Sequence, residues 1–329
     1  MDTLIFSVNA VAPIILVILL GYFIQRINMV PENFFVYANK LVFNVAIPVY
    51  LFYSVYNIEN LSDINWRLIL FAVIMVIFIC LAAAVFFMMY TKDSGKRGVL
   101  IQCAFRSNYA IIGIPLAKAM GGESALATAA VVSAVGIPTF NILAVIVLSV
   151  FSYDNNGKKT SFVDILKSIC KNPLIIGVGC ALVCLAVRNY VPFTIKENLP
   201  FIYDTVEDVG SLASPLALIV LGGRFQVSAV KELARDITFG VLWRLILAPV
   251  ICMFILMTLA NYGIFALSKA DFPALIAFYG SPVAVSSAIM AESMNCHGEL
   301  ARQLVIWCNI VSIFTVFAII VVCKYAGLI

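Results

Sequence analysis

The chain has 329 residues, of which 63% are hydrophobic and only 12% are charged, and its mean hydropathy is +1.06. Soluble domains are about 45–50% apolar, so this composition predicts an integral membrane protein embedded in a lipid bilayer, with no soluble domain and no nucleic-acid partner. The net charge of +4 says little about partners, because in a membrane chain the positions of the basic residues matter more than their sum.

Long apolar runs alternate with short charged connectors along the whole chain. Each run can cross a hydrocarbon core of about 30 Å as a helix, whereas the strands of a membrane barrel would alternate polar and apolar residues over about ten positions. The first run lacks a basic leader and a small-residue cleavage site, so we interpret it as a retained span and not a signal peptide. We expect ten spans, at about 4–25, 34–57, 67–90, 98–120, 124–151, 173–190, 203–223, 236–260, 272–293 and 301–325.

Lysine and arginine are shared unequally between the connectors on the two sides of these spans. The connectors that follow spans 1, 3, 5, 7 and 9 carry most of them. Basic residues concentrate on the cytoplasmic side of membrane proteins. We therefore expect a multi-pass protein of the cell membrane with both its N-terminus and its C-terminus outside.

Prolines recur at a fixed distance in the two halves of the chain. Pro48 and Pro215 are 167 positions apart, and so are Pro115 and Pro282. Chance matches among twelve prolines are the alternative explanation. A repeated unit of five spans has an odd number of crossings, so its second copy runs inverted, which is the plan of many secondary transporters. The sequence thus predicts an all-α membrane protein with repeats at 1–151 and 173–329 and a cytoplasmic connector at 152–172.

A proline inside a membrane helix removes one backbone donor, and protein, water or ligand must then satisfy the freed groups. The sequence predicts such breaks at Gly113 and Pro115 in span 4 and at Gly280 and Pro282 in span 9. In an inverted repeat the two broken helices cross near the midplane. The N-terminal ends of their second halves then favour an anion such as a carboxylate. Pro48 and Pro215 similarly predict kinks in spans 2 and 7.

Polar side chains within the spans are the candidate ligands. Asn108 precedes the span-4 proline by seven positions, and it either contacts a ligand or caps backbone groups that the proline frees. Asn141 and Asn309 stand at corresponding positions of spans 5 and 10, where they either face the crossover or act as ordinary interhelical hydrogen-bonding groups. Ser281 and Ser286 flank the span-9 proline, and they are suited to hydrogen bonding or to close packing.

Charged residues within the spans are few. Arg106 and Arg244 lie well inside, where charge is rare and usually functional, although a long apolar stem also lets arginine reach the interface. The family resemblance described below, which includes the stretch "FRSN", makes Arg106 the better candidate, as an attractant for an acid or as the partner of an acidic side chain. Asp208 and Glu292 are the acidic residues appreciably within spans, so neither a proton site nor a sodium site is indicated and the coupling stays open.

Neither a metal site nor a catalytic constellation is indicated. The nine cysteines show no paired spacing, and His297 is the single histidine. We expect no metal, no cofactor and no enzyme activity, because no nucleophile has a base beside it in the sequence pattern.

Six stretches of the chain carry a family resemblance over nearly its whole length. They are "APIILVILLGYFIQR", "NKLVFNVAIPVYLF", "FRSNYAIIGIPLAKAMGG", "NPLIIG", "VGSLASPLALIVLGGRF" and "SPVAVSSAIMAESMNCHGEL". Their order and spacing resemble the auxin efflux carrier family, which includes plant auxin exporters and bacterial permeases for malate and malonate. The most specific part is the pattern N-x-x-x-x-G-x-P, carried here by Asn108, Gly113 and Pro115.

The resemblance implies a fold similar to that of bile-acid carriers and sodium/proton antiporters. Spans 1, 2, 6 and 7 would form a scaffold, and spans 3–5 and 8–10 would form a mobile transport domain. A homodimer could form through the scaffold. The connector at 152–172 is short compared with the loop of the plant carriers, so regulation by phosphorylation of that loop does not carry over.

The sequence is consistent with three functions. The leading one is secondary transport of a small organic anion, a carboxylate or a dicarboxylate such as malate or malonate, by an elevator-type alternating-access movement. The alternative within transport is efflux of an apolar weak acid, as in the plant relatives. The alternative from another class is a membrane receptor that transports nothing.

Overall fold

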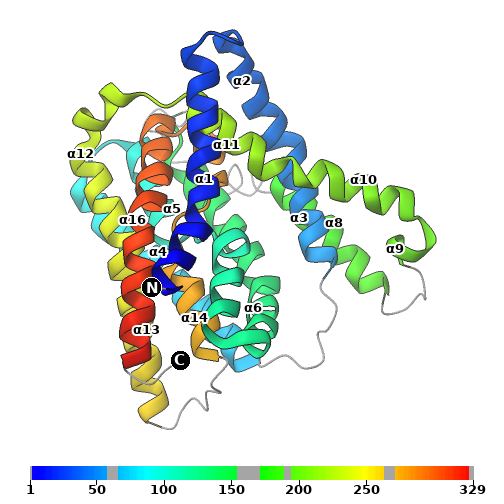
Figure 1. The fold of residues 1–329 in the computed structure, drawn as a ribbon, viewed down its shortest axis with the longest axis vertical. Helices are drawn as coiled ribbons and strands as arrows, with labels where there is room; N and C mark the ends of the chain where they lie inside the picture. Colours follow the sequence, from blue (N-terminus) through cyan, green and yellow to red (C-terminus); the bar gives the residue numbers. More distant parts are fainter. Residues whose placement is uncertain (1, 58–65, 154–170, 189–193, 263–270, 326–329) are drawn as a thin grey trace.

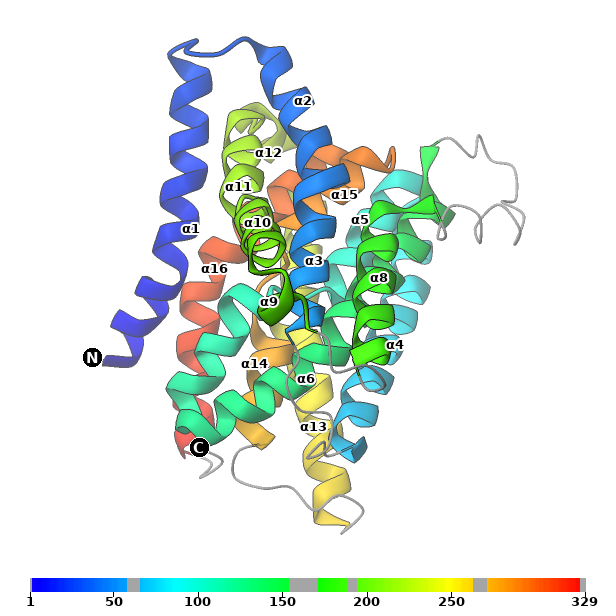
Figure 2. The same ribbon diagram turned by 90° about the vertical axis from the view of Figure 1, so that its right-hand side faces the viewer.

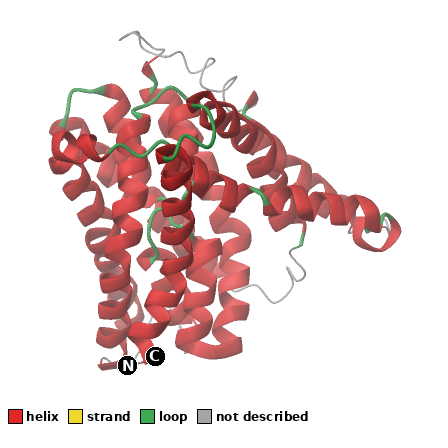
Figure 3. Cartoon of the chain, turned by 45° about the horizontal axis from the view of Figure 1, so that its top comes forward, coloured by secondary structure: helices red, strands yellow, loops and turns green. Residues whose placement is uncertain are grey.

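In a computed structural model, the protein is described over residues 2–57, 66–153, 171–188, 194–262 and 271–325 (Figure 1). Within these ranges the secondary structure is helical, with turns and short loops between the helices (Figure 3). This agrees with the helical class predicted from the long apolar runs. Most of the expected connector at 152–172 lies outside the described residues.

The helices follow one another in the order listed here, with short π-helical turns marked η. The first half of the chain contains α1 (Asp2–Arg26), α2 (Glu32–Leu41), η1 (Val42–Ala46), α3 (Ile47–Tyr56), α4 (Trp66–Tyr90), α5 (Ser94–Phe105), η2 (Tyr109–Gly113) and α6 (Ile114–Phe151). The second half contains α8 (Pro173–Arg188), α9 (Ile195–Asn198), α10 (Pro200–Ser211), α11 (Ala213–Gly223), α12 (Val227–Leu242), η4 (Trp243–Leu247), α13 (Ala248–Asn261), α14 (Asp271–Gly280), α15 (Ser286–Ser293) and α16 (Gly298–Tyr325).

Six helical segments of the described chain are long and apolar enough to cross a membrane, which supports a multi-pass membrane protein. They are Glu32–Tyr56, Trp66–Tyr90, Tyr109–Phe151, Pro200–Gly223, Ala229–Ala260 and Gly298–Cys323. Two further apolar helices, Ala12–Arg26 and Pro173–Arg188, are shorter. The predicted total of ten spans in two inverted repeats stays a prediction.

Gly122 divides the longest of these segments into two helices. Its φ of 68° lies in the left-handed region, inside a stretch that is otherwise helical from Ile114 to Phe151. Only glycine adopts this conformation at little cost. The bend falls between the sequence ranges expected for spans 4 and 5.

The helices pack in two groups. The α1 group consists of α1, α2, α3, α8, α10 and α11, and the α6 group consists of α4, α5, α6 and α12 to α16. Within the α1 group, Gly21 of α1 and Gly222 of α11 allow two backbones to touch, since an added Cβ would collide with the backbone of Ile219 or Ile18. Helix α1 also packs on α16 of the other group.

Three prolines are accommodated by π-helical turns. The turns η1, η2 and η4 directly precede helices whose second residues are Pro48, Pro115 and Pro249. A proline has no N–H and its ring collides with the carbonyl four residues back, and one wider turn relieves both problems. Helical structure therefore continues through Pro48 and Pro115, whereas Pro215 lies near the start of α11, just after the junction with α10.

The two ends of the bundle are distinct in the figures. Helix α1 begins, and α16 ends, toward the lower end of Figures 1 and 2, and the turn from α1 to α2 lies at the opposite, upper end. The connection from α11 to α12 also lies at that upper end, which we call the α1–α2 end. Helices α9 and α10 project from one side of the bundle.

Candidate functional site

Two helices are interrupted inside the α6 group, and the interruptions pair with each other. Helix α5 ends at Phe105 and helical structure resumes at Tyr109, while α14 ends at Gly280 and α15 begins at Ser286. Ser107 and Val283 form an isolated antiparallel bridge. The backbone N–H of Asn108 donates to the carbonyl of Pro282 over 2.8 Å, so the two interruptions lie side by side.

The interruption in span 4 lies earlier in the chain than predicted. The sequence placed it at Gly113 and Pro115, but the chain leaves the helix at Arg106 to Asn108. The carbonyl of Asn108 accepts the N–H groups of Ile112 and Gly113 at 3.0 and 3.3 Å, which starts η2 and carries the helix on through Pro115. In span 9, by contrast, Pro282 lies within the interruption itself.

Arg244 of η4 binds the carbonyl ends of both interrupted helices. Its guanidinium donates to the carbonyl oxygens of Ala104 and Phe105 at 3.4 and 3.1 Å, where α5 ends. It also donates to Tyr279 at 2.9 Å and twice to Ser281, at 2.9 and 2.7 Å, where α14 ends. The side chain is only 1% exposed. One cation thus neutralises the negative ends of two helices and satisfies carbonyls that have no helical partner.

Arg106 is a second buried cation, and its partners are all neutral. It is 3% exposed. One Nη atom donates to Oδ1 of Asn141 and to Oγ of Ser286, both at 2.8 Å, and the other contacts Sδ of Met290. Asn141 in turn donates to the carbonyl of Ile137 at 2.8 Å, which fixes its amide. Within the described chain no carboxylate forms an ion pair with Arg106, so its charge is uncompensated.

A cavity of about 150 Å³ lies against Arg106, between the two groups of helices. The α6 group contributes Arg106 to Ile111, three residues of α6 and Ala284 to Ser286, and the α1 group contributes residues of α3, α10 and α11. Arg106 is the single charged residue among those that line this cavity. Both η2 and α15 begin at this cavity, and the N–H groups of Ser287 and Ala288 donate to the carbonyls of Ala284 and Val285 just before α15.

Asn108 lines the same cavity and has an unused donor. Its side chain is 4% exposed, and its Nδ2 atom finds no acceptor in the described part of the chain. Burying an amide donor without an acceptor costs about 1–3 kcal/mol. A ligand that offers acceptor oxygens would remove this cost.

The predicted site residues separate into two sets. Arg106, Asn108, Asn141 and Ser286 surround the cavity. Ser281 and Asn309 are fully buried away from its lining and bond to carbonyls of their own helices at 2.6 and 2.7 Å.

The two predicted glycines occupy different surroundings. Gly113 ends η2, where an added Cβ would collide with the ring of Tyr109. Gly280 ends α14 and is buried, and a Cβ there would press on Ile319.

Aromatic rings pack against Tyr109 at the start of η2. The ring of Phe278 stacks on Phe140 and meets Tyr109 edge to face, with centroids 4.8 Å apart in both pairs. The Tyr109 hydroxyl donates to the carbonyl of Ala274 at 3.2 Å. These contacts fix the interrupted helix before any ligand binds, which lowers the cost of ordering the site.

Sequence reasoning noted Arg244 but assigned it no role. Its depth in a span was a usable signal, because a buried cation needs partners. The cavity residues from α10 and α11, among them Gly210, Ser211 and Ser214, gave no such signal, since small residues are common in membrane helices.

Apolar helices, two of them interrupted beside a cavity that contains one buried charge, define a protein of the membrane transporter class. Comparison with known families agrees: the model of the membrane transport protein family, the auxin efflux carrier family, matches residues 6–320. The chain belongs to that family.

Relatives with this likeness include two archaeal proteins. An uncharacterized transporter of Methanocaldococcus jannaschii is 26% identical over 246 residues, which are 72% of this chain and 73% of the relative. An uncharacterized transporter of Methanothermobacter thermautotrophicus is 30% identical over 126 residues, which are 37% of this chain and 41% of the relative.

Proposed function

We propose that this protein is a secondary transporter that carries a small organic anion across the cell membrane. The observation that carries the proposal is Arg106, a buried guanidinium at a cavity with only neutral partners. An uncompensated charge in a low-dielectric interior is costly. A carboxylate in the cavity would compensate it and would also accept the unused N–H of Asn108.

The backbone around the cavity also favours an anion. Helical structure begins at Tyr109 and at Ser286, both on the cavity lining. The N-terminal end of a helix carries a partial positive charge, which favours an anion. No aspartate or glutamate stands among the residues that line the cavity, so an anion would meet no carboxylate there.

The proposed mechanism is an elevator-type movement of one group of helices against the other. The cavity lies between the α1 group, which would be the scaffold, and the α6 group, which would be the transport domain. Two paired interruptions support the inverted-repeat plan, in which such sites alternate between the two sides of the membrane. On this proposal both termini face outside, as the distribution of lysine and arginine predicts.

The cavity lining favours an anion with one charged end and an apolar body over a dicarboxylate. Beside Arg106 the lining is largely apolar, with Ile47, Leu51, Ile137 and Phe140 among its residues. A second carboxylate would therefore lose its hydration without meeting a second cation. This observation supports the alternative of an apolar weak acid within the same transport class.

Counterflow in proteoliposomes tests both the transport of a carboxylate through Arg106 and the preference for apolar monocarboxylates. The panel contains labelled monocarboxylates with aliphatic and aromatic bodies, together with malate and malonate. We expect accumulation of at least one carboxylate by the parent and its loss in Arg106→Gln, with the apolar monocarboxylates ahead of the dicarboxylates. Lys118→Gln, which removes an exposed ion pair with Glu123, is the matched control and should transport normally. Equal counterflow in Arg106→Gln and the parent would overturn the proposed site.

A further inference from the structure

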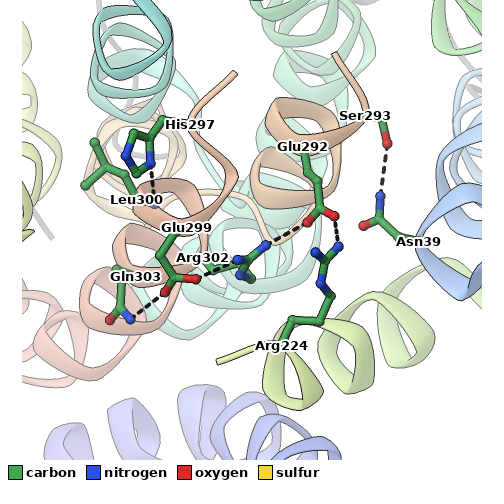
Figure 4. Close-up of polar contacts among 9 residues, drawn as sticks. All are labelled: Asn39, Arg224, Glu292, Ser293, His297, Glu299, Leu300, Arg302 and Gln303. Carbon is green, nitrogen blue, oxygen red and sulfur yellow. Dashed lines mark hydrogen bonds and ion pairs between the residues drawn. The ribbon is translucent and has the colours of Figure 1, made fainter. Parts of the chain in front are cut away.

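A second polar cluster lies outside the cavity and joins α11 to α15 and α16 (Figure 4). Arg224, the residue after α11, pairs with Oε1 of Glu292 on α15. Arg302 of α16 pairs with Oε2 of the same carboxylate at 2.7 Å and with Glu299 at 2.5 Å. The four charges are balanced, and all four side chains are at least largely shielded from solvent.

Two neutral hydrogen bonds extend this cluster. Asn39 of α2 donates from Nδ2 to Oγ of Ser293 over 3.0 Å, beside the ion pairs (Figure 4). Gln303 of α16 donates from Nε2 to the carbonyl of Gln226, in the connection after α11, over 2.8 Å. Asn39 lies in α2 and Arg224 directly follows α11, both in the α1 group, whereas Ser293, Glu292 and Arg302 lie in the α6 group. The cluster therefore fastens the two groups together near the α1–α2 end.

The Arg224 contact can break at low cost. Glu292 keeps Arg302 as a partner when Arg224 leaves, because its two oxygens hold one arginine each. The Arg224 side chain is already 26% exposed, so its guanidinium can be hydrated on release. Breaking a buried ion pair usually leaves a charge without a partner. Here Glu292 would keep Arg302, and Arg224 would be hydrated.

Helix α15 connects the cluster to the cavity. Its first residue, Ser286, and its middle residue, Met290, both contact Arg106. Its last residues, Glu292 and Ser293, hold Arg224 and Asn39. At 1.5 Å per residue the two ends are about 10 Å apart, so a rigid helix of this length transmits a shift from one end to the other.

We propose that Arg224–Glu292 and Asn39–Ser293 form a reversible latch between the two groups of helices and that α15 links the latch to Arg106. A carboxylate that takes the N–H groups of Arg106 competes with Ser286 and Met290 and so loosens α15. Occupancy of the cavity then favours release of the latch. The link to occupancy rests on the proposed transport function, whereas the latch itself does not.

Distances between spin labels across the latch test it without any ligand. Labels on Met29→Cys, in the turn after α1, and Glu232→Cys, on α12, are both on exposed residues, one in each group. Cys170, Cys180 and Cys184 are replaced by serine in this background. In Arg224→Gln we expect a longer-distance population to rise roughly two- to fivefold over the parent, the effect of one partly exposed ion pair.

Lys96→Gln is the matched control. Lys96 pairs with Asp236 at 2.7 Å with side-chain exposures of 24% and 13%, close to the 26% and 22% of Arg224 and Glu292. That pair joins α5 to α12 within the α6 group, so its loss should leave the distance distribution unchanged. Arg224→Lys keeps the cation and should restore the short distance. An Arg224→Gln distribution equal to the parent's, or the same shift in Lys96→Gln, would overturn the latch.

A second arm adds the carboxylate that gives the largest counterflow. It should increase the longer-distance population in the parent and have no effect in Arg106→Gln. A transported carboxylate that leaves the parent distances unchanged overturns the link through α15. If no carboxylate is transported but Arg224→Gln still opens, the latch stands and the proposed function fails.

Discussion

Replacing Arg106 by glutamine is the most direct perturbation of the candidate site. The guanidinium makes two hydrogen bonds of 2.8 Å to neutral groups, and glutamine keeps an amide that can bond to the same groups. What the variant loses is the charge and the paired donors that a carboxylate would use. A hydrogen bond to a charged group contributes about 1.5–3 kcal/mol, so the loss of two gives at least about 3 kcal/mol, or roughly a hundredfold in Kd.

The assay is equilibrium binding of the carboxylate found by counterflow, measured on purified protein by calorimetry. Arg106→Lys keeps the charge but not the planar pair of donors, so its Kd should fall between those of the parent and the glutamine variant. Thermal melting of each variant shows whether the fold is intact. Binding by a folded Arg106→Gln variant within a factor of two of the parent would refute the reasoning, because the guanidinium would then serve only to bond Asn141 and Ser286.

Three further predictions follow from the same contacts. Asn108→Ala should weaken carboxylate binding about ten- to a hundredfold. Asn108→Asp should bind the carboxylate more weakly still at neutral pH, because it places a negative charge at the unused donor. A carboxylate Kd of the aspartate variant equal to the parent's would show that Asn108 only stabilises the interruption. Arg244→Met leaves carbonyls at the ends of α5 and α14 without a donor, so the free energy of unfolding should fall by about 3 kcal/mol or more, and by less in Arg244→Lys. Melting points equal to the parent's would show that Arg244 does not stabilise these helix ends. Gly222→Ala should cost about 1–3 kcal/mol by forcing α1 away from α11, whereas Gly179→Ala, whose Cβ would meet open space, should not lower the melting point.

Much of the candidate site could be predicted from the sequence. Arg106, Asn108, Asn141 and Ser286 are polar residues in apolar runs, and a bilayer leaves such residues few places other than a protein-lined cavity. Their mutual contacts were not within reach, because the Arg106 bonds to Asn141 and Ser286 connect residues 35 and 180 positions apart. Asn309 carries the same local signal as Asn141, and both amides donate to a carbonyl of their own helix, but only the oxygen of Asn141 also accepts from Arg106. The local sequence pattern thus identified the candidate polar residues, and long-range packing determines which of them line the cavity.

The role of Arg244 was out of reach for a related reason. Its partners are backbone carbonyls of Ala104, Phe105, Tyr279 and Ser281, and carbonyl groups leave no mark in the amino-acid sequence. A search for an acidic partner would have failed, since Arg244 binds the carbonyl ends of two helices in place of a carboxylate. An intramembrane arginine without an acid nearby is therefore a signal for interrupted helices as much as for an anionic ligand.

The misplaced interruption in span 4 shows why proline alone is a poor marker of a break. A proline deletes one donor, and a single π-helical turn absorbs that loss, as it does before Pro48, Pro115 and Pro249. An interruption requires the chain to leave helical dihedral angles, as Arg106 does with ψ at 112°. It persists only where other groups satisfy the exposed backbone, here the Pro282 carbonyl and the Arg244 guanidinium. The equal spacing of Pro115 and Pro282 thus aligns residues with different structural roles, and the paired interruptions, rather than the prolines, are the features on which a comparison of the two halves should rest.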